Sequence, residues 1–381
     1  MPFSRLYLHI PWCLNKCGYC AFFSAPGTPS QRAETVRLSL REMELAARRY
    51  TAAGPLASVY LGGGTPSLLT PEQVSRLLNR SRDLWGYQTA CEITLEANPG
   101  TVTPPSLAAF RQAGVNRLSL GIQTLDDRLL QALGRIHNGA QARNAYAAAR
   151  AAGFTSISLD LICGLPGQSH SDWLLLLHEV IALAPEHLSV YSLTIEAGTP
   201  FYRRYPPGSK ALPDDDQTAA MLEEADHLLT GAGYGHYEIA NFALPGHHSR
   251  HNCGYWQRDG YLGVGPGVHS LLLQGWGRRC SNPADHRQWA DLIGSGRLAQ
   301  VAEPPLTAAE ALSEQLFLGL RMADGVTPES CLQQFGPALW APHGESIVEL
   351  IATGLLERCG DRVALTRRGM LLANQVFLKF L

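Results

Sequence analysis

The sequence has no apolar run long enough to cross a membrane. The apolar stretch at residues 6–10 is too short, and the one at 174–177 is flanked by Asp172 and Glu179. A basic segment followed by an apolar one, typical of an export signal, is missing as well. We therefore expect a cytoplasmic protein with no membrane span, and peripheral contact with a membrane surface is left open.

An excess of charge of one sign is also absent. The formal net charge is -2, from 31 basic and 33 acidic residues. From residue 306 onward, six basic residues stand against eight acidic ones. Because proteins that bind nucleic acids carry a clearly basic surface, we expect no nucleic-acid partner.

The cysteines do not indicate a disulfide framework, because there are nine of them and no export signal. Six are scattered along the chain, and we interpret them as small buried apolar side chains. The other three, Cys13, Cys17 and Cys20, fall within eight residues of one another.

Short β-rich runs alternate with amphipathic helical stretches over the first two-thirds of the chain. The predicted strands cover residues 5–10, 58–61, 92–95, 117–120, 156–161 and 187–193. Such a βα repeat predicts an α/β fold with a parallel sheet and right-handed crossovers, either open or closed into a barrel.

From about residue 303 the alternation stops. Helices are predicted at 308–322, 327–335, 344–352 and 368–380, with a short hairpin before the last of them. We therefore divide the chain into a β/α unit (1–235), an extension (236–302) and a C-terminal, helical, winged-helix-like domain (303–381).

Residues suited to binding a ligand or a metal stand at the end of one predicted strand after another. The carboxyl ends of parallel strands share one face, so we expect these groups to converge. They are Cys13, Gly63, Glu96, Gln123, Asp160 and Glu196.

The cysteine triad has the composition of an iron–sulfur site. Iron–sulfur clusters are held by thiolates, usually four, and three ligands leave one iron open to a small molecule. Structural zinc, with His9 as a fourth ligand, is the alternative. No second Cys/His pair follows at zinc-finger spacing, which favours the cluster.

Cys13-x3-Cys17-x2-Cys20, with Tyr19 before the last cysteine, resembles the radical S-adenosylmethionine (SAM) superfamily. Other segments extend the resemblance over nearly the whole chain, to the oxygen-independent coproporphyrinogen III oxidase family. They are YLHIPWC at 7–13, GGGTPS at 62–67, EANP at 96–99, GIQ at 121–123, LGRIH at 133–137 and DLICGLP at 160–166. The resemblance implies a radical SAM partial (β/α)6 barrel over residues 1–235.

The resemblance also implies the ligands. Cys13, Cys17 and Cys20 would hold a [4Fe–4S] cluster, and SAM would fill its open iron. The residues implied to line the SAM site are Tyr7, Tyr19, Gly63, Gly64, Thr65, Glu96, Gln123, Arg135, Asp160 and His269. For Arg135 and Asp160, an ion pair in solvent or inside the barrel is the alternative.

One motif favours a particular branch of the family. The segment HNCGYW at 251–256 matches the His-Asn-x-x-Tyr-Trp motif of HemW-type heme chaperones. Phe22 stands where the oxidases have a further cysteine, and the first strand begins near Met1 without their N-terminal extension.

The resemblance implies that His251, Asn252, Tyr255 and Trp256 bind heme. A neutral imidazole is a common axial ligand, and aromatic rings cover the macrocycle. His251 is the expected ligand, with the neighbouring histidines at 247 and 248 as competitors. A structural loop whose aromatic side chains pack on the barrel is the alternative.

Two functions follow from these resemblances. The favoured one is a heme chaperone that binds heme and passes it to an acceptor protein, without coproporphyrinogen oxidase activity. The other is a coproporphyrinogen III oxidase, in which a radical derived from SAM starts oxidative decarboxylation of the substrate's propionates.

Overall fold

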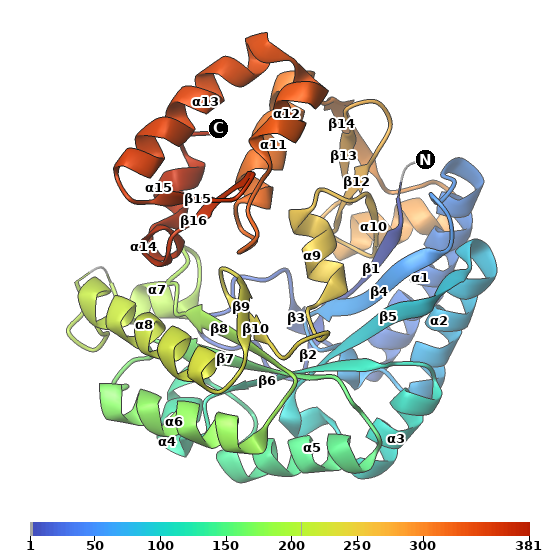
Figure 1. Ribbon diagram of the computed structural model, residues 1–381. Coiled ribbons are helices and arrows are strands. Elements are labelled where there is room, and N and C mark those ends of the chain that lie inside the picture. The colour runs from blue at the N-terminus through green and yellow to red at the C-terminus, as the bar shows by residue number, and fades with distance from the viewer. Residues whose placement is uncertain (1–2, 207) are drawn as a thin grey trace.

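The computed structural model describes residues 3–206 and 208–381 of the chain. A single curved sheet of twelve strands runs through the larger part of the molecule, with helices on its outer side (Figure 1). The strand order is β14-β13-β12-β11-β1-β4-β5-β6-β7-β8-β10-β9. Within the described ranges, no helix is both long and apolar enough to cross a bilayer.

Six neighbouring strands at the centre of this sheet are parallel, as the βα repeat predicts. They are β1 (Arg5–Ile10), β4 (Leu56–Gly63), β5 (Tyr87–Ala97), β6 (Arg117–Gln123), β7 (Ile157–Cys163) and β8 (His187–Ser192). The predicted α/β class and the partial (β/α)6 barrel are confirmed, and the strand ends differ from the predicted ones by a few residues.

Helices connect the parallel strands along the outer face. Thr70 and Thr103 cap two of them with their side chains, and a proline follows each cap. Two-residue and one-turn elements complete this part: β2 (Trp12–Cys13), β3 (Ala25–Pro26), η1 (Pro66–Leu68) and η2 (Pro99–Thr101). The helices are α1 (Pro29–Arg49), α2 (Pro71–Trp85), α3 (Pro104–Gln112), α4 (Asp127–Leu133), α5 (Gly139–Ala151), α6 (His170–Leu183), α7 (Pro200–Arg204) and α8 (Asp215–Gly231).

The following segment extends the sheet at both edges, with strands that the sequence did not indicate. β9 and β10 continue it beyond β8, whereas β11 pairs in parallel with β1 and carries β12 to β14 outward. These elements are β9 (Gly235–Glu238), β10 (Asn241–Ala243), α9 (Arg250–Trp256), β11 (Tyr261–Val264), β12 (His269–Leu272), β13 (Arg278–Ser281), α10 (His286–Gly294) and β14 (Val301–Pro305).

The C-terminal helices enclose a hydrophobic core of their own, separate from the core of the sheet. The elements are α11 (Ala308–Gly319), α12 (Pro328–Phe335), α13 (Pro337–Ala352), β15 (Leu356–Cys359), β16 (Arg362–Leu365), α14 (Arg367–Leu371) and α15 (Ala373–Phe377).

Two helix predictions in this part were wrong. The helix expected at 368–380 is broken at Leu372, whose φ of -105° and ψ of 22° leave the helical region. The break lets Val376 and Phe377 pack into the C-terminal core. The helix expected from residue 344 begins at Pro337 and continues through Pro342.

Glu42 joins helix α1 to the extension. Its carboxylate accepts hydrogen bonds from the backbone N–H of Gly265 (2.8 Å), from Asn282 Nδ2 (2.7 Å) and from Trp289 Nε1 (3.0 Å). The side chain is buried, and burial raises its pKa to about 7 although these donors oppose the shift.

We expect the Glu42 carboxyl to make folding stability depend on pH. Its folded pKa lies above the ordinary value of 4.5, so between about pH 4.5 and 7 the folded chain binds more protons than the unfolded one. This contribution is complete below that window and is lost as the pH rises through it. Glu42→Gln should flatten the fall in melting temperature between pH 5 and 7, measured anaerobically by calorimetry.

The matched control is Glu34→Gln, on the same helix but exposed. It should leave the pH slope of the wild type intact. Equal slopes in wild type and Glu42→Gln would show that the Glu42 carboxyl does not titrate in this range.

Candidate functional site

The three cysteines lie on the loop that follows β1, at the carboxyl end of the parallel strands. Cys13 ends β2 and is buried, whereas Cys17 and Cys20 are half-buried; all three are free thiols. Backbone hydrogen bonds from Cys20 to Cys17 (3.2 Å) and from Gly18 to Leu133 (3.3 Å) fix the loop. The triad is thus presented on an ordered loop that is tied to the barrel.

Two polar neighbours contact the thiols directly. The Thr65 hydroxyl lies 3.5 Å from Cys13 Sγ, and Arg135 Nη1 lies 3.6 Å from Cys17 Sγ. Burial raises the pKa of Cys13, and the Thr65 hydroxyl partly offsets it. Donors aimed at sulfur favour a thiolate, the form that ligates iron.

A cavity of about 450 Å³ opens beside the triad, and we call it the cysteine cavity. It brings together side chains from the ends of five parallel strands and from α9. Its lining includes Cys13, Cys17, Tyr19, Cys20, Gly63, Gly64, Thr65, Glu96, Gln123, Arg135, Asp160 and Asn252. The residues expected at the strand ends therefore converge on one cavity. Of these residues, Gly63 and Glu96 also line a second cavity.

Two half-buried carboxyl groups, Glu96 and Asp160, face this cavity. Glu96 accepts hydrogen bonds from the Tyr60 hydroxyl (2.8 Å) and from the Gly63 N–H (3.0 Å). Burial, the largest cause, raises the pKa of Glu96 to about 7. Burial also raises the pKa of Asp160, to which Ser119 donates at 3.1 Å.

Arg135 has a buried donor without a partner, and Gln123 has an unusual backbone conformation; both features are typical of binding sites. Arg135 Nη2 donates to the Gly121 carbonyl at 2.5 Å, and its Nε is buried with no partner in the described structure. Gln123 has a φ of 65°, the left-handed region that a residue other than glycine rarely adopts. A buried orphan donor beside three thiols fits a site built for an anionic or polar ligand.

Close packing against the backbone explains why a glycine follows β4 at position 64. A Cβ on Gly64 would lie 2.8 Å from the Pro11 carbonyl carbon and 2.9 Å from the backbone of Trp12. The Gly64 N–H donates to the Ile10 carbonyl at 2.8 Å. Gly64 thus lets β4 approach the strand that leads into the cysteine loop.

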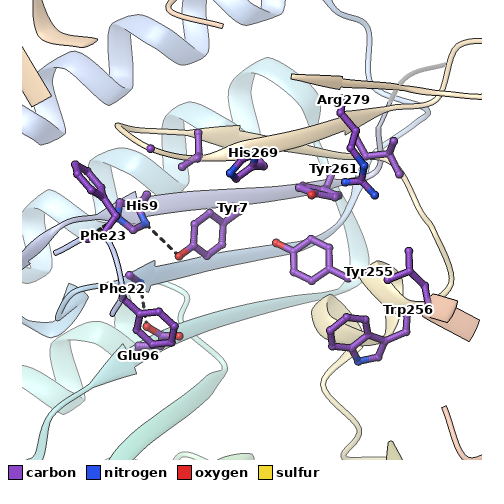
Figure 2. A pocket seen from close by; sticks show the side chains of 15 residues that line it. Tyr7, His9, Phe22, Phe23, Glu96, Tyr255, Trp256, Tyr261, His269 and Arg279 are labelled. Carbon is purple, nitrogen blue, oxygen red and sulfur yellow. Dashed lines mark hydrogen bonds between the residues drawn. The ribbon is translucent and has the colours of Figure 1, made fainter. Parts of the chain in front are cut away.

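A second cavity, of about 440 Å³, adjoins the first, and we call it the aromatic cavity (Figure 2). The two share Phe22, Gly63 and Glu96. Its lining is Tyr7, His9, Phe22, Phe23, Gly63, Glu96, Tyr255, Trp256, Tyr261, Gly267, Val268, His269, Leu271, Arg279 and Leu318. Tyr7 and His269, expected at the SAM site, line this cavity instead, because β1 and β12 turn these side chains toward it.

The segment at 251–256 lies in helix α9, and its side chains line two different cavities. Asn252 lines the cysteine cavity, whereas Tyr255 and Trp256 line the aromatic cavity. Figure 2 shows Tyr255 pointing toward Tyr7 across the latter. The motif therefore forms part of the wall between the two cavities.

His251 lies behind this wall and lines neither cavity. Its exposed fraction is 0%, Nδ1 is 2.8 Å from the Ser58 hydroxyl, and Nε2 is 2.8 Å from the Tyr255 hydroxyl. Burial, followed by Arg5 and Arg117, lowers its pKa well below the ordinary value. With both ring nitrogens in use, the structure does not offer His251 as an iron ligand; it positions Tyr255.

Sequence reasoning did not identify several residues that line these cavities. Arg117, Ser119, Gly121 and Gln123 occupy every second position along β6, and all four line the cysteine cavity. That period of two was visible in the sequence and could have found them. Arg279 comes from an unpredicted strand, and no local pattern marked it.

The Radical SAM superfamily model matches residues 7–180, and the HemN C-terminal domain model matches residues 306–372. The chain is 37% identical to "Heme chaperone HemW" of Mycobacterium tuberculosis, covering 98% of this chain and 94% of that protein. It is 35% identical to "Heme chaperone HemW" of Bacillus subtilis, covering 98% of each.

Among solved structures, the coproporphyrinogen III oxidase (HemN) from Escherichia coli, a radical SAM enzyme, aligns with a TM-score of 0.85. The alignment covers 99% of this chain and 90% of that one at 23% identity, so it shows a shared fold.

Proposed function

The chain belongs to the HemW heme-chaperone family of radical SAM proteins, and we propose that it binds heme and passes it to an acceptor protein. The observation that carries the proposal is the aromatic cavity beside the cysteine triad, with Tyr255 and Trp256 of the family motif in its wall. Aromatic rings around an open cavity suit a flat, apolar macrocycle.

Cys13, Cys17 and Cys20 would hold a [4Fe–4S] cluster. Bound there with an open iron, the cluster would coordinate SAM and supply an electron to it. The chain supplies the rest: Thr65 and Arg135 donate toward the thiols, and the Arg135 guanidinium also faces the cavity.

For SAM we propose the cysteine cavity, with Tyr19, Gly63, Gly64, Thr65, Glu96, Gln123, Arg135 and Asp160 as its lining. The half-buried carboxyl groups of Glu96 and Asp160 can accept hydrogen bonds from an amino group and hydroxyls, whereas Arg135 can pair with a carboxylate. Asn252 lines the cysteine cavity and would contact SAM there, whereas Tyr255 and Trp256 on the same helix would contact heme in the aromatic cavity.

The acceptor protein is expected to take heme through the open side of the aromatic cavity. We place this exchange in the cytoplasm, because the nine free cysteines suit a reducing compartment.

An anaerobic turnover assay separates the chaperone from an oxidase. Protein reconstituted with iron and sulfide is mixed with SAM, a reductant and coproporphyrinogen III, and the products are resolved by liquid chromatography. We expect no protoporphyrinogen IX, with a coproporphyrinogen III oxidase assayed in parallel as the positive control. Repeated turnover to protoporphyrinogen would overturn the chaperone function.

A further inference from the structure

The aromatic cavity is lined by two imidazoles, and only one of them has free ring nitrogens. His9 is buried, with Nε2 2.9 Å from the Phe23 carbonyl oxygen and Nδ1 3.2 Å from the Tyr7 hydroxyl. His269 is exposed in the cavity, and no hydrogen bond to its side chain occurs among the described residues. A ring nitrogen with a free lone pair is what an axial iron ligand requires.

The strand that carries His269 places it above the rings of the cavity. His269 begins β12, and Leu271, two residues on, faces the same side. Leu271 pairs with Tyr261 on β11 and with Arg279 on β13, and all three line the cavity. Figure 2 shows His269 and Tyr261 on one side of the cavity, with Tyr7 and Tyr255 below them.

Arg279, on the same side of the cavity, belongs to an ion cluster that contains more positive than negative charge. Glu314 accepts from Arg279 Nε at 2.6 Å and from Arg258 Nε at 2.8 Å, so one carboxylate faces two guanidinium groups. Arg279 lines the cavity and retains donors beyond its Nε. A guanidinium with spare donors at the edge of an apolar cavity suits a ligand that carries carboxylates.

We propose that His269 is the axial ligand of heme iron in the aromatic cavity and that Arg279 pairs with a heme propionate. This inference rests on the proposed heme-binding function and assigns its ligand and its orientation. His251, buried behind the wall, holds Tyr255 in place against the macrocycle.

The test of the ligand is a heme titration of reconstituted protein, followed by absorption and electron paramagnetic resonance. His269→Ala should weaken heme binding at least tenfold and remove the signature of histidine ligation, and added imidazole should restore that signature. The control His227→Ala changes an exposed histidine on the outer helix α8 and should behave as wild type.

The test of orientation uses heme dimethyl ester, whose propionates carry no charge. Wild type should bind heme more tightly than the ester, and Arg279→Gln should remove that preference while iron ligation is retained. An unchanged spectrum and affinity in His269→Ala would overturn the ligand assignment and leave heme binding standing. Failure of the wild type to bind heme would instead overturn the proposed function.

Discussion

Replacing Cys17 with serine is expected to abolish the iron–sulfur cluster. After anaerobic reconstitution, iron and acid-labile sulfide should fall from about four of each per chain to near zero, because two thiolates cannot retain a cubane. Loss of the cluster should be accompanied by loss of the broad visible absorption. The measurement is colorimetric iron and sulfide analysis of the gel-filtered protein.

Cys359→Ser is the matched control, since Cys359 is an exposed cysteine on the C-terminal hairpin, outside both cavities. It should retain the iron and sulfide content of the wild type. A full complement of both in Cys17→Ser would mean that the cluster is held elsewhere, and the cysteine cavity would lose its role.

Replacing Gly254 with alanine is expected to destabilise the fold strongly. A Cβ at this position in α9 would lie 1.7 Å from Arg5 Nε and 2.2 Å from its Cζ. The Arg5 side chain has little freedom to move, because it donates to Asp259 (2.6 Å), Ser58 (3.2 Å) and the Arg250 carbonyl (2.7 Å).

Displacing Arg5 breaks its ion pair with the partly exposed Asp259 and removes its hydrogen bonds to Ser58 and to the Arg250 carbonyl. The partly exposed ion pair contributes little, whereas overpacking costs about 1–3 kcal/mol and each buried polar group left without a partner costs about 1–3 kcal/mol. Gly254→Ala should therefore lower the melting temperature by several degrees and weaken heme binding, because the same network holds His251 and hence Tyr255. Anaerobic calorimetry and a heme titration measure the two effects.

Gly294→Ala provides the comparison. Gly294 ends α10, and a Cβ there would meet no atom within 4 Å. Alanine is the better helix former, so this variant should be as stable as wild type or slightly more so. If Gly254→Ala, like Gly294→Ala, left the melting temperature unchanged, α9 would not pack tightly against Arg5 as we infer.

The barrel and the cysteine loop could be predicted because their signals are local. The parallel strands alternate with helices at a recognisable period, and Cys13, Cys17 and Cys20 lie within one loop. The residues at strand ends, such as Glu96 and Asp160, follow from topology, because parallel strands end on one face.

The division of the site into two cavities could not be predicted in this way. The role of His251 depends on Ser58, 193 residues away in the chain, and on complete burial under the sheet. Similarly, Arg279 reaches the site through β13, and that strand is recruited by pairing with β12 in the extended sheet. A histidine within an aromatic motif predicts heme ligation, whereas tertiary packing decides which nitrogen has a free lone pair.

The most direct test of heme binding in the aromatic cavity is anomalous diffraction at the iron edge, on crystals of anaerobically reconstituted protein loaded with heme. We predict one cluster of iron peaks within reach of Cys13, Cys17 and Cys20, and a separate single iron between His269 and the Tyr255 ring. A heme iron on the outer surface, or among the three cysteines, would contradict this account.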